Sequence, residues 1–269
     1  MSTRNVQASR VVRRIGYTGR SLYNRLRHGS FEPLKKVAHR PHSSTRRELY
    51  NSYHQAQAYR YTTSYGAQFL DLVCRHYRFA SVLDAGCGGG IVVRSLLHRG
   101  YLARGIELSD WVVKRECPDL LDMGIVHIGS LDKLPYKDSS FDLVFSSDVL
   151  EHIPVASVST VASELVRVCR HHLFLSINLR PSSDNNAHHL TLRPREWWEN
   201  VFAEAGATKN GPLVAHLQKT KPGATNREIL EAGPAQSIVH EMDKFLQEEP
   251  YSFHGELEPW IFAFAVRKA

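Results

Sequence analysis

Cysteine is scarce in this 269-residue chain, and its four copies (Cys74, Cys87, Cys117 and Cys169) are far apart and form no C-x-x-C pair. This spacing argues against a zinc site and against a disulfide framework, and it favours a reducing compartment. No apolar run reaches the roughly 18 residues that a membrane-spanning helix needs. The N-terminal region also lacks the apolar core of a signal peptide, so we expect a cytoplasmic rather than a secreted protein.

Acidic residues are almost absent from the first 60 positions. That segment holds 13 Lys and Arg against two acids, Glu32 and Glu48, and carries +11, whereas the whole chain carries +7. The remaining 209 residues therefore carry −4, and the basic character belongs to an arm and not to the body. We expect a flexible or targeting arm over residues 1–49 and one domain over residues 50–269, with an insertion at about 221–258.

The first 31 residues contain seven Arg, no Lys and no acid. Three interpretations remain open. The segment fits a mitochondrial transit peptide, which would make the protein mitochondrial. It also fits an arm that binds a membrane surface or another anionic partner. The third interpretation is a disordered basic tail.

Five tyrosines are concentrated between residues 50 and 65. The segment is expected to form a helical lead-in to the domain. Its aromatic side chains could cap a ligand pocket or pack on a sheet, and we favour packing because aromatics at helical spacing usually belong to a core.

From residue 80 onward, short apolar strands alternate with amphipathic helices, which predicts an α/β fold. Expected strands are 81–84, 103–107, 125–128, 141–146, 173–177, 212–217 and 260–266, and expected helices are 91–99, 155–169 and 194–205. We therefore predict a doubly wound, mainly parallel, seven-stranded Rossmann-like sheet preceded by a basic N-terminal arm.

The most informative segment is residues 82–90, VLDAGCGGG, which joins the first strand to a helix. A glycine-rich turn at a helix N-terminus lets the backbone approach a ligand closely. Gly86 and Gly88 satisfy two positions of the dinucleotide fingerprint, but its third glycine position is occupied by Ile91. Asp84 at the strand tip would repel a pyrophosphate and attract an ammonium or sulfonium group.

A second acid, Glu107, ends the second strand 23 residues after Asp84. An acid at this place can accept hydrogen bonds from both hydroxyls of a ribose. Together the two acids and the glycine loop predict a pocket for a nucleoside with an amino-acid-like cationic end.

These residues resemble a known family, the class I S-adenosylmethionine-dependent methyltransferases, and in particular its type 11-like members. The resemblance covers about residues 65–269 and rests on four runs: VLDAGCGGG (82–90), RGIELSD (104–110), GSLDKLPYKDSSFDLVFSSDVLEHI (129–153) and HHLTLRPREWWENVFAEAGA (188–207).

The resemblance implies S-adenosylmethionine as cofactor and seven binding residues: Asp84, Gly86, Gly88 and Ser147 at the methionine end, Glu107 at the ribose, and Leu108 and Leu131 at the adenine. The chain departs from the family at Ser130, where many members have Asp, so an adenine-edge contact is expected to be missing.

Transfer of a methyl group to a hydroxyl needs a proton acceptor, most often His or a carboxylate. His152 follows the fourth strand and is the first candidate for a general base; the alternative is that it caps a helix or bonds backbone. His189, with His188 before it, follows the fifth strand near the same rim and is the second catalytic candidate.

A metal-binding alternative comes from small-RNA 3′-end 2′-O-methyltransferases, which place carboxylates and histidines at similar positions. Asp148, Glu151, His152 and His189 could form such a site for Mg²⁺ or Mn²⁺. Asp148 stands where that family has Glu, and Ile153 where it has a second His. The sequence prediction is therefore that no metal is bound.

The acceptor is expected to be a small molecule or a glycan- or lipid-linked hydroxyl. The body of the chain lacks a basic stripe with interleaved aromatics, so a nucleic-acid partner is not favoured. Two alternatives stay open: an RNA or protein methyltransferase, in a mitochondrion for instance, and a catalytically silent methyltransferase fold that serves as an assembly factor.

Overall fold

The computed structural model describes residues 41–56, 65–179, 189–213 and 261–266. In chain order the elements are α3 (Pro41–Ala56), η1 (Tyr65–Phe69), α4 (Leu70–His76), β1 (Ser81–Ala85), α5 (Ile91–His98), β2 (Leu102–Glu107), α6 (Asp110–Glu116), α7 (Pro118–Asp122), β3 (Val126–Ile128), β4 (Phe141–Ser147), η2 (Leu150–His152), α8 (Val155–Val168), β5 (Cys169–Ser176), α9 (Arg195–Glu204), β6 (Ala207–Lys209) and β7 (Ile261–Val266).

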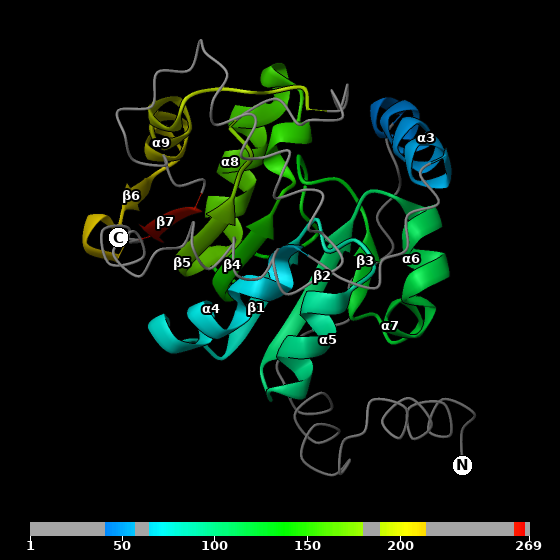
Figure 1. Cartoon of the computed structure of the whole chain (residues 1–269), viewed down its shortest axis with the longest axis horizontal. Coiled ribbons are helices and arrows are strands. Elements are labelled where there is room, and N and C mark those ends of the chain that lie inside the picture. Colours follow the sequence, from blue (N-terminus) through cyan, green and yellow to red (C-terminus); the bar gives the residue numbers. More distant parts are fainter. Residues whose placement is uncertain (1–40, 57–64, 180–188, 214–260, 267–269) are drawn as a thin grey trace, which may run out of the picture.

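The strands form one seven-stranded sheet in the order β3-β2-β1-β4-β5-β7-β6 (Figure 1). Strands β1 to β5 pair in parallel, whereas β7 runs antiparallel to both β5 and β6. The predicted fold class is confirmed. The order reverses between β1 and β4, and in open α/β sheets ligands bind beside the strand ends at such a reversal.

Helices cover both faces of the sheet. Neighbouring residues of a strand point to opposite faces, so they pack against different helices. Val82 of β1 packs in the cluster that holds the apolar sides of α4 and α5. Leu83, the next residue, packs in the cluster of α8 and α9. Figure 1 shows these two pairs of helices against the sheet. The arrangement is the doubly wound one that the strand–helix alternation predicted.

The start of β5 differs from the prediction. The helix was expected to run to Cys169 and the strand to begin at Leu173, but α8 ends at Val168 and β5 begins at once with Cys169. Residues Arg170 and His171 are exposed, so the first half of the strand carries no apolar pattern. The boundary was wrong because the strand is recognisable only where both of its faces are buried.

The sixth strand was also wrongly placed. It was expected at 212–217, but β6 is Ala207–Lys209, directly after the positive-φ Gly206 that follows α9, and residues 211–213 are helical. Thr208 and Lys209 are exposed, as befits a short edge strand that pairs only with β7 within the described ranges. Residues 214–217 lie outside the described part.

Helix α3 straddles the expected boundary between residues 49 and 50, and it lies beside α6 (Figure 1). The rest of the arm, residues 1–40, lies outside the described residues, as does the expected insertion at 221–258. Over the described segments, no helix combines the length and the apolar character that crossing a membrane requires.

Candidate active site

The glycine loop that follows β1 is held against the second strand. The amides of Gly86 and Cys87 both donate to the carbonyl of Ile106, at 2.9 and 3.0 Å. Gly86, Gly88 and Gly90 have φ angles of 83°, 49° and 75°. Because side chains are strained at such positive φ values, the turn needs glycine at these positions. The loop therefore presents bare backbone at the start of α5.

Gly86 also has no space for a side chain, because a Cβ there would lie 2.4 Å from Cγ2 of Val149 in the loop after β4. We expect Gly86→Ala to push the two loops apart and to weaken S-adenosylmethionine binding at least about tenfold, in addition to the roughly 1–2 kcal/mol cost of a left-handed alanine. Isothermal titration calorimetry and thermal melting measure the two effects.

Gly206→Ala is the matched control for this prediction. Its φ is 95°, but a Cβ there would meet nothing within 4 Å. The control should lose a similar stability and keep its affinity for the cofactor. Equal affinities of the two variants would show that the approach of Val149 to Gly86 does not shape the pocket.

Glu107, at the end of β2, ties the glycine loop to the next turn. Its Oε2 accepts a hydrogen bond from the amide of Gly88 at 3.0 Å, and its Oε1 accepts one from the amide of Ser109 at 2.9 Å. Burial raises the pKa of this carboxyl, although the backbone donors of Ser109 and Gly88 oppose the shift. A carboxylate offers about four lone-pair sites, so two remain for the ribose hydroxyls that the sequence predicted.

Asp84 lies on the neighbouring strand β1, where it pairs with Gly105, two residues before Glu107, and it is only 3% exposed. Burial, followed by the negative charge of Glu107, raises its pKa from the ordinary 3.8 to about 8. The two acids that the sequence placed in one pocket do lie together. A ligand that brings positive charge to this place favours the ionised carboxylates and so opposes the rise in the pKa of Asp84.

The other predicted cofactor residues lie around the same strand ends. Leu108 directly follows Glu107 and is partly exposed. Leu131, in the loop after β3, is 6% exposed and packs in the cluster that contains Ile106. Ser147 closes β4, and its hydroxyl donates to Oδ2 of Asp148 at 2.9 Å.

Two acids follow β4 at the same edge of the sheet. Asp148 has a φ of 53°, and its carboxylate also accepts a hydrogen bond from the Ser176 hydroxyl at 3.3 Å. Burial raises its pKa to about 6. Glu151 is 1% exposed, and its Oε1 accepts from the amide of Asn178 at 3.2 Å. Its Oε2 is buried without a hydrogen-bond partner among the described residues.

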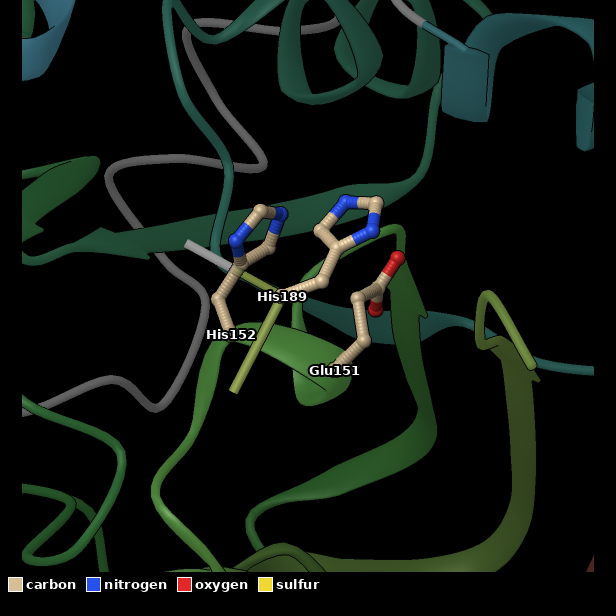
Figure 2. A group of neighbouring side chains, drawn as sticks. All are labelled: Glu151, His152 and His189. Carbon is tan, nitrogen blue, oxygen red and sulfur yellow. The ribbon is translucent and has the colours of Figure 1, made fainter. Parts of the chain in front are cut away.

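The two histidines proposed as catalytic lie together. The rings of His152 and His189 are edge to face with their centroids 4.8 Å apart. One potential ligand atom from each of these rings and one from Glu151 all lie within 4.8 Å of one another. Figure 2 shows the Glu151 carboxylate directed toward the imidazole of His189. The neighbouring candidate His188 falls outside the described residues.

Sequence reasoning missed the contribution of α3 to this site. The Tyr50 hydroxyl donates to the carbonyl of His152 at 3.1 Å. The next residue, Asn51, donates to Asp110 at 2.7 Å and accepts from the Ser109 hydroxyl at 2.7 Å. Tyr50 thus contacts the site rim, as in the alternative that the tyrosines cap a ligand pocket. The cluster of tyrosines was the signal that pointed to the alternative.

The strand order, the glycine loop after β1 and the acid ending β2 define a Rossmann-like methyltransferase fold. Residues 83–176 match the family model described as a methyltransferase domain. Residues 83–176 therefore form a methyltransferase domain, in agreement with the predicted resemblance to the S-adenosylmethionine-dependent methyltransferases and with S-adenosylmethionine as cofactor.

Curated relatives agree with this class. A ubiquinone biosynthesis O-methyltransferase from Nitrosospira multiformis is 35% identical over 129 residues, which are 42% of this chain and 51% of that protein. One with the same name from Nitrosomonas europaea is 33% identical over 124 residues, 43% of this chain and 51% of that protein. The chain thus spans about half the length of these relatives.

Solved structures share the fold. Phosphoethanolamine N-methyltransferase 2 of Haemonchus contortus, in complex with S-adenosylmethionine, matches with a TM-score of 0.50 and 16% identity over 76% of this chain and 53% of that one. A protein from the conversion of a disulfide bond into a thioacetal group in echinomycin biosynthesis also has a TM-score of 0.50, with 20% identity over 61% of this chain and 80% of that one.

Proposed function

We propose that the protein transfers the methyl group of S-adenosylmethionine to a hydroxyl oxygen of a small molecule or of a glycan- or lipid-linked acceptor. The observation that carries this proposal is the meeting of Asp84 and Glu107 beside the glycine loop, where Glu107 bonds the Gly88 amide at 3.0 Å. The names of the curated relatives, which are O-methyltransferases of ubiquinone biosynthesis, favour an oxygen acceptor.

In the proposed complex, the methionine end of the cofactor lies against Asp84, Gly86, Gly88 and Ser147. Glu107 binds the ribose, and Leu108 and Leu131 contact the adenine. Asp84, which is buried, and Glu107, which is half-buried, supply the negative charge that a sulfonium and an ammonium group require, in a setting where screening by water is weak.

The transfer itself is an in-line displacement. The acceptor oxygen forms a bond to the methyl carbon, the carbon–sulfur bond breaks, and its electron pair neutralises the sulfonium to leave S-adenosylhomocysteine. The hydroxyl proton has to leave the acceptor. The imidazoles of His152 and His189, beside the end of β4, are the groups that we propose to promote its removal.

The methyl acceptor can be found by incubating the full chain with labelled S-adenosylmethionine and cell-extract fractions that contain metabolites, lipids and glycans, RNA, or protein. Label is expected in methyl ethers of the first two fractions. Label confined to RNA or protein would contradict the proposed acceptor class, and no binding of S-adenosylmethionine would contradict the enzyme itself.

His152→Ala and His189→Ala are each expected to lower kcat by about 10²- to 10⁴-fold, the usual contribution of proton transfer. Affinity for S-adenosylmethionine should change little, because neither ring belongs to the predicted cofactor pocket. His171→Ala is the control, since His171 is exposed on β5. Unchanged turnover in both variants would show that the pair has only a structural role.

The basic arm bears on where the protein is located and on what it contacts. We propose a cytoplasmic enzyme whose residues 1–49 contact a membrane surface or another anionic partner, with mitochondrial import as the alternative. Imaging the full chain fused to a fluorescent protein at its C-terminal end, together with the mass of the mature chain, distinguishes the two locations.

A further inference from the structure

Glu151 has a buried carboxylate whose charge is not balanced by any ion pair among the described residues. Its side chain is 1% exposed, its Oε2 has no hydrogen-bond partner in the described segments, and the acid Asp148 is close enough to raise its pKa further. None of the ion pairs of the described residues involves it. A buried carboxylate in this setting is costly unless a positive charge accompanies it.

The imidazoles of His152 and His189 lie beside the Glu151 carboxylate. A nitrogen of His152, a nitrogen of His189 and an oxygen of Glu151 lie within 4.8 Å of one another. Ligand atoms sit about 2.0–2.2 Å from a bound zinc ion, so two ligands of one such ion are at most about 4.4 Å apart. The limit of 4.8 Å is close to this span, so the three side chains of Figure 2 are near enough to share one ion.

Each potential ligand is held by its surroundings. The carbonyl of Glu151 accepts a hydrogen bond from the Thr191 amide at 2.9 Å, and the Thr191 hydroxyl donates to the carbonyl of Ile153 at 2.6 Å. These two bonds tie the segment of His189 to η2. Tyr50 fixes the backbone of His152 from the other side. Supporting contacts of this kind orient ligands around metal ions in proteins.

We propose that Glu151, His152 and His189 bind one divalent transition-metal cation, which holds the hydroxyl oxygen of the methyl acceptor. Two imidazoles and one carboxylate suit Zn²⁺, Co²⁺, Fe²⁺ or Mn²⁺, whereas Mg²⁺ and Ca²⁺ prefer oxygen ligands. Asp148 is not a ligand, because its oxygens accept from the hydroxyls of Ser147 and Ser176. Three protein ligands leave a position open for the acceptor.

This cation deepens the proposed function and rests on it for the acceptor. A metal-bound hydroxyl has a lowered pKa, so its proton passes to water while its oxygen stays in place to attack the methyl carbon. The two histidines then act through the metal and need not accept the proton themselves.

Co²⁺ is a suitable probe, because its visible spectrum reports nitrogen and oxygen ligation. The full chain, stripped with a chelator, is expected to bind one equivalent of Co²⁺ and to develop visible absorption. Glu151→Gln and His189→Ala should lower the affinity more than about 100-fold, since the loss of a supporting contact alone costs about 10- to 100-fold. His171→Ala, the exposed control on β5, should bind as the unmodified chain does.

Circular dichroism of each variant establishes that it is folded before the comparison. Equal Co²⁺ binding by the unmodified chain and both cluster variants would overturn the proposal, because the ion would then lie elsewhere, and so would the absence of binding. S-adenosylmethionine binding is measured on the same samples. A chain that binds the cofactor but not Co²⁺ refutes the metal site alone, and a chain that does not bind the cofactor refutes the proposed function.

Discussion

Alanine in place of Glu107 is expected to lower the affinity for S-adenosylmethionine by roughly 10²- to 10⁴-fold. Two hydrogen bonds from the ribose to a charged acceptor contribute about 1.5–3 kcal/mol each, or about 3–6 kcal/mol together. The substitution also removes the acceptor of the Gly88 and Ser109 amides, so the glycine loop loses its link to the turn before α6. Calorimetric titration of the full chain measures the affinity.

Two further variants make the Glu107 result interpretable. Glu107→Gln keeps the length of the side chain and one carbonyl oxygen, and it should fall between the alanine variant and the unmodified chain. Asp122→Ala removes an exposed acid at the end of α7 and should leave the affinity unchanged. An alanine variant that binds the cofactor normally would place the ribose away from the end of β2.

Asp84→Asn is expected to shift stability and cofactor affinity in opposite directions. The pKa of Asp84 rises from 3.8 to about 8 in the folded chain because the carboxyl is buried and lies beside Glu107. Between these values the folded state holds a proton that the unfolded state has lost, so the stability of the ligand-free chain falls as pH rises toward 8 and levels off above it. Asparagine cannot ionise, and the variant should lose this slope.

The same substitution removes the charge that a cationic ligand needs. Cofactor affinity of the unmodified chain should rise with pH up to about 8, and binding at pH 7 should release close to one proton, because the ligand favours the ionised carboxylate. Melting curves from pH 5 to 9, and calorimetry in two buffers of different ionisation enthalpy, test both effects. A variant with a higher affinity at pH 8 would contradict the role of Asp84.

The sequence predicted most strands of the sheet closely, and it failed at β6 and at the start of β5. Strands β1, β2 and β4 each hold a buried apolar stretch, and the prediction placed them within one residue. By contrast, β6 has three residues, two of them exposed, and no pattern reveals it. Helix α6 was missed although Ser109, whose hydroxyl accepts from the Val112 amide, is a good N-cap that a search for helix starts would have found.

The site was predictable where its residues are neighbours in the chain. Asp84, Gly86 and Gly88 come from one turn, and Glu107 follows from the spacing of the parallel strands. The contact of His152 with His189 joins positions 37 residues apart in the sequence and depends on how residue 189 returns to η2. The contact of Tyr50 with His152 spans 102 residues. The sequence named these residues as candidates, but their contacts depend on long-range packing that local patterns do not specify.

The place of β7 between β5 and β6 has a consequence for folding during synthesis. The edge of β5 that pairs with Ile261–Val266 remains open until about 90 further residues have left the ribosome, a delay on the order of 5–18 s at about 5–20 residues per second. For that time an apolar strand edge can pair with another chain. The nascent protein is therefore most prone to aggregation just before its last strand emerges, when it depends most on chaperones.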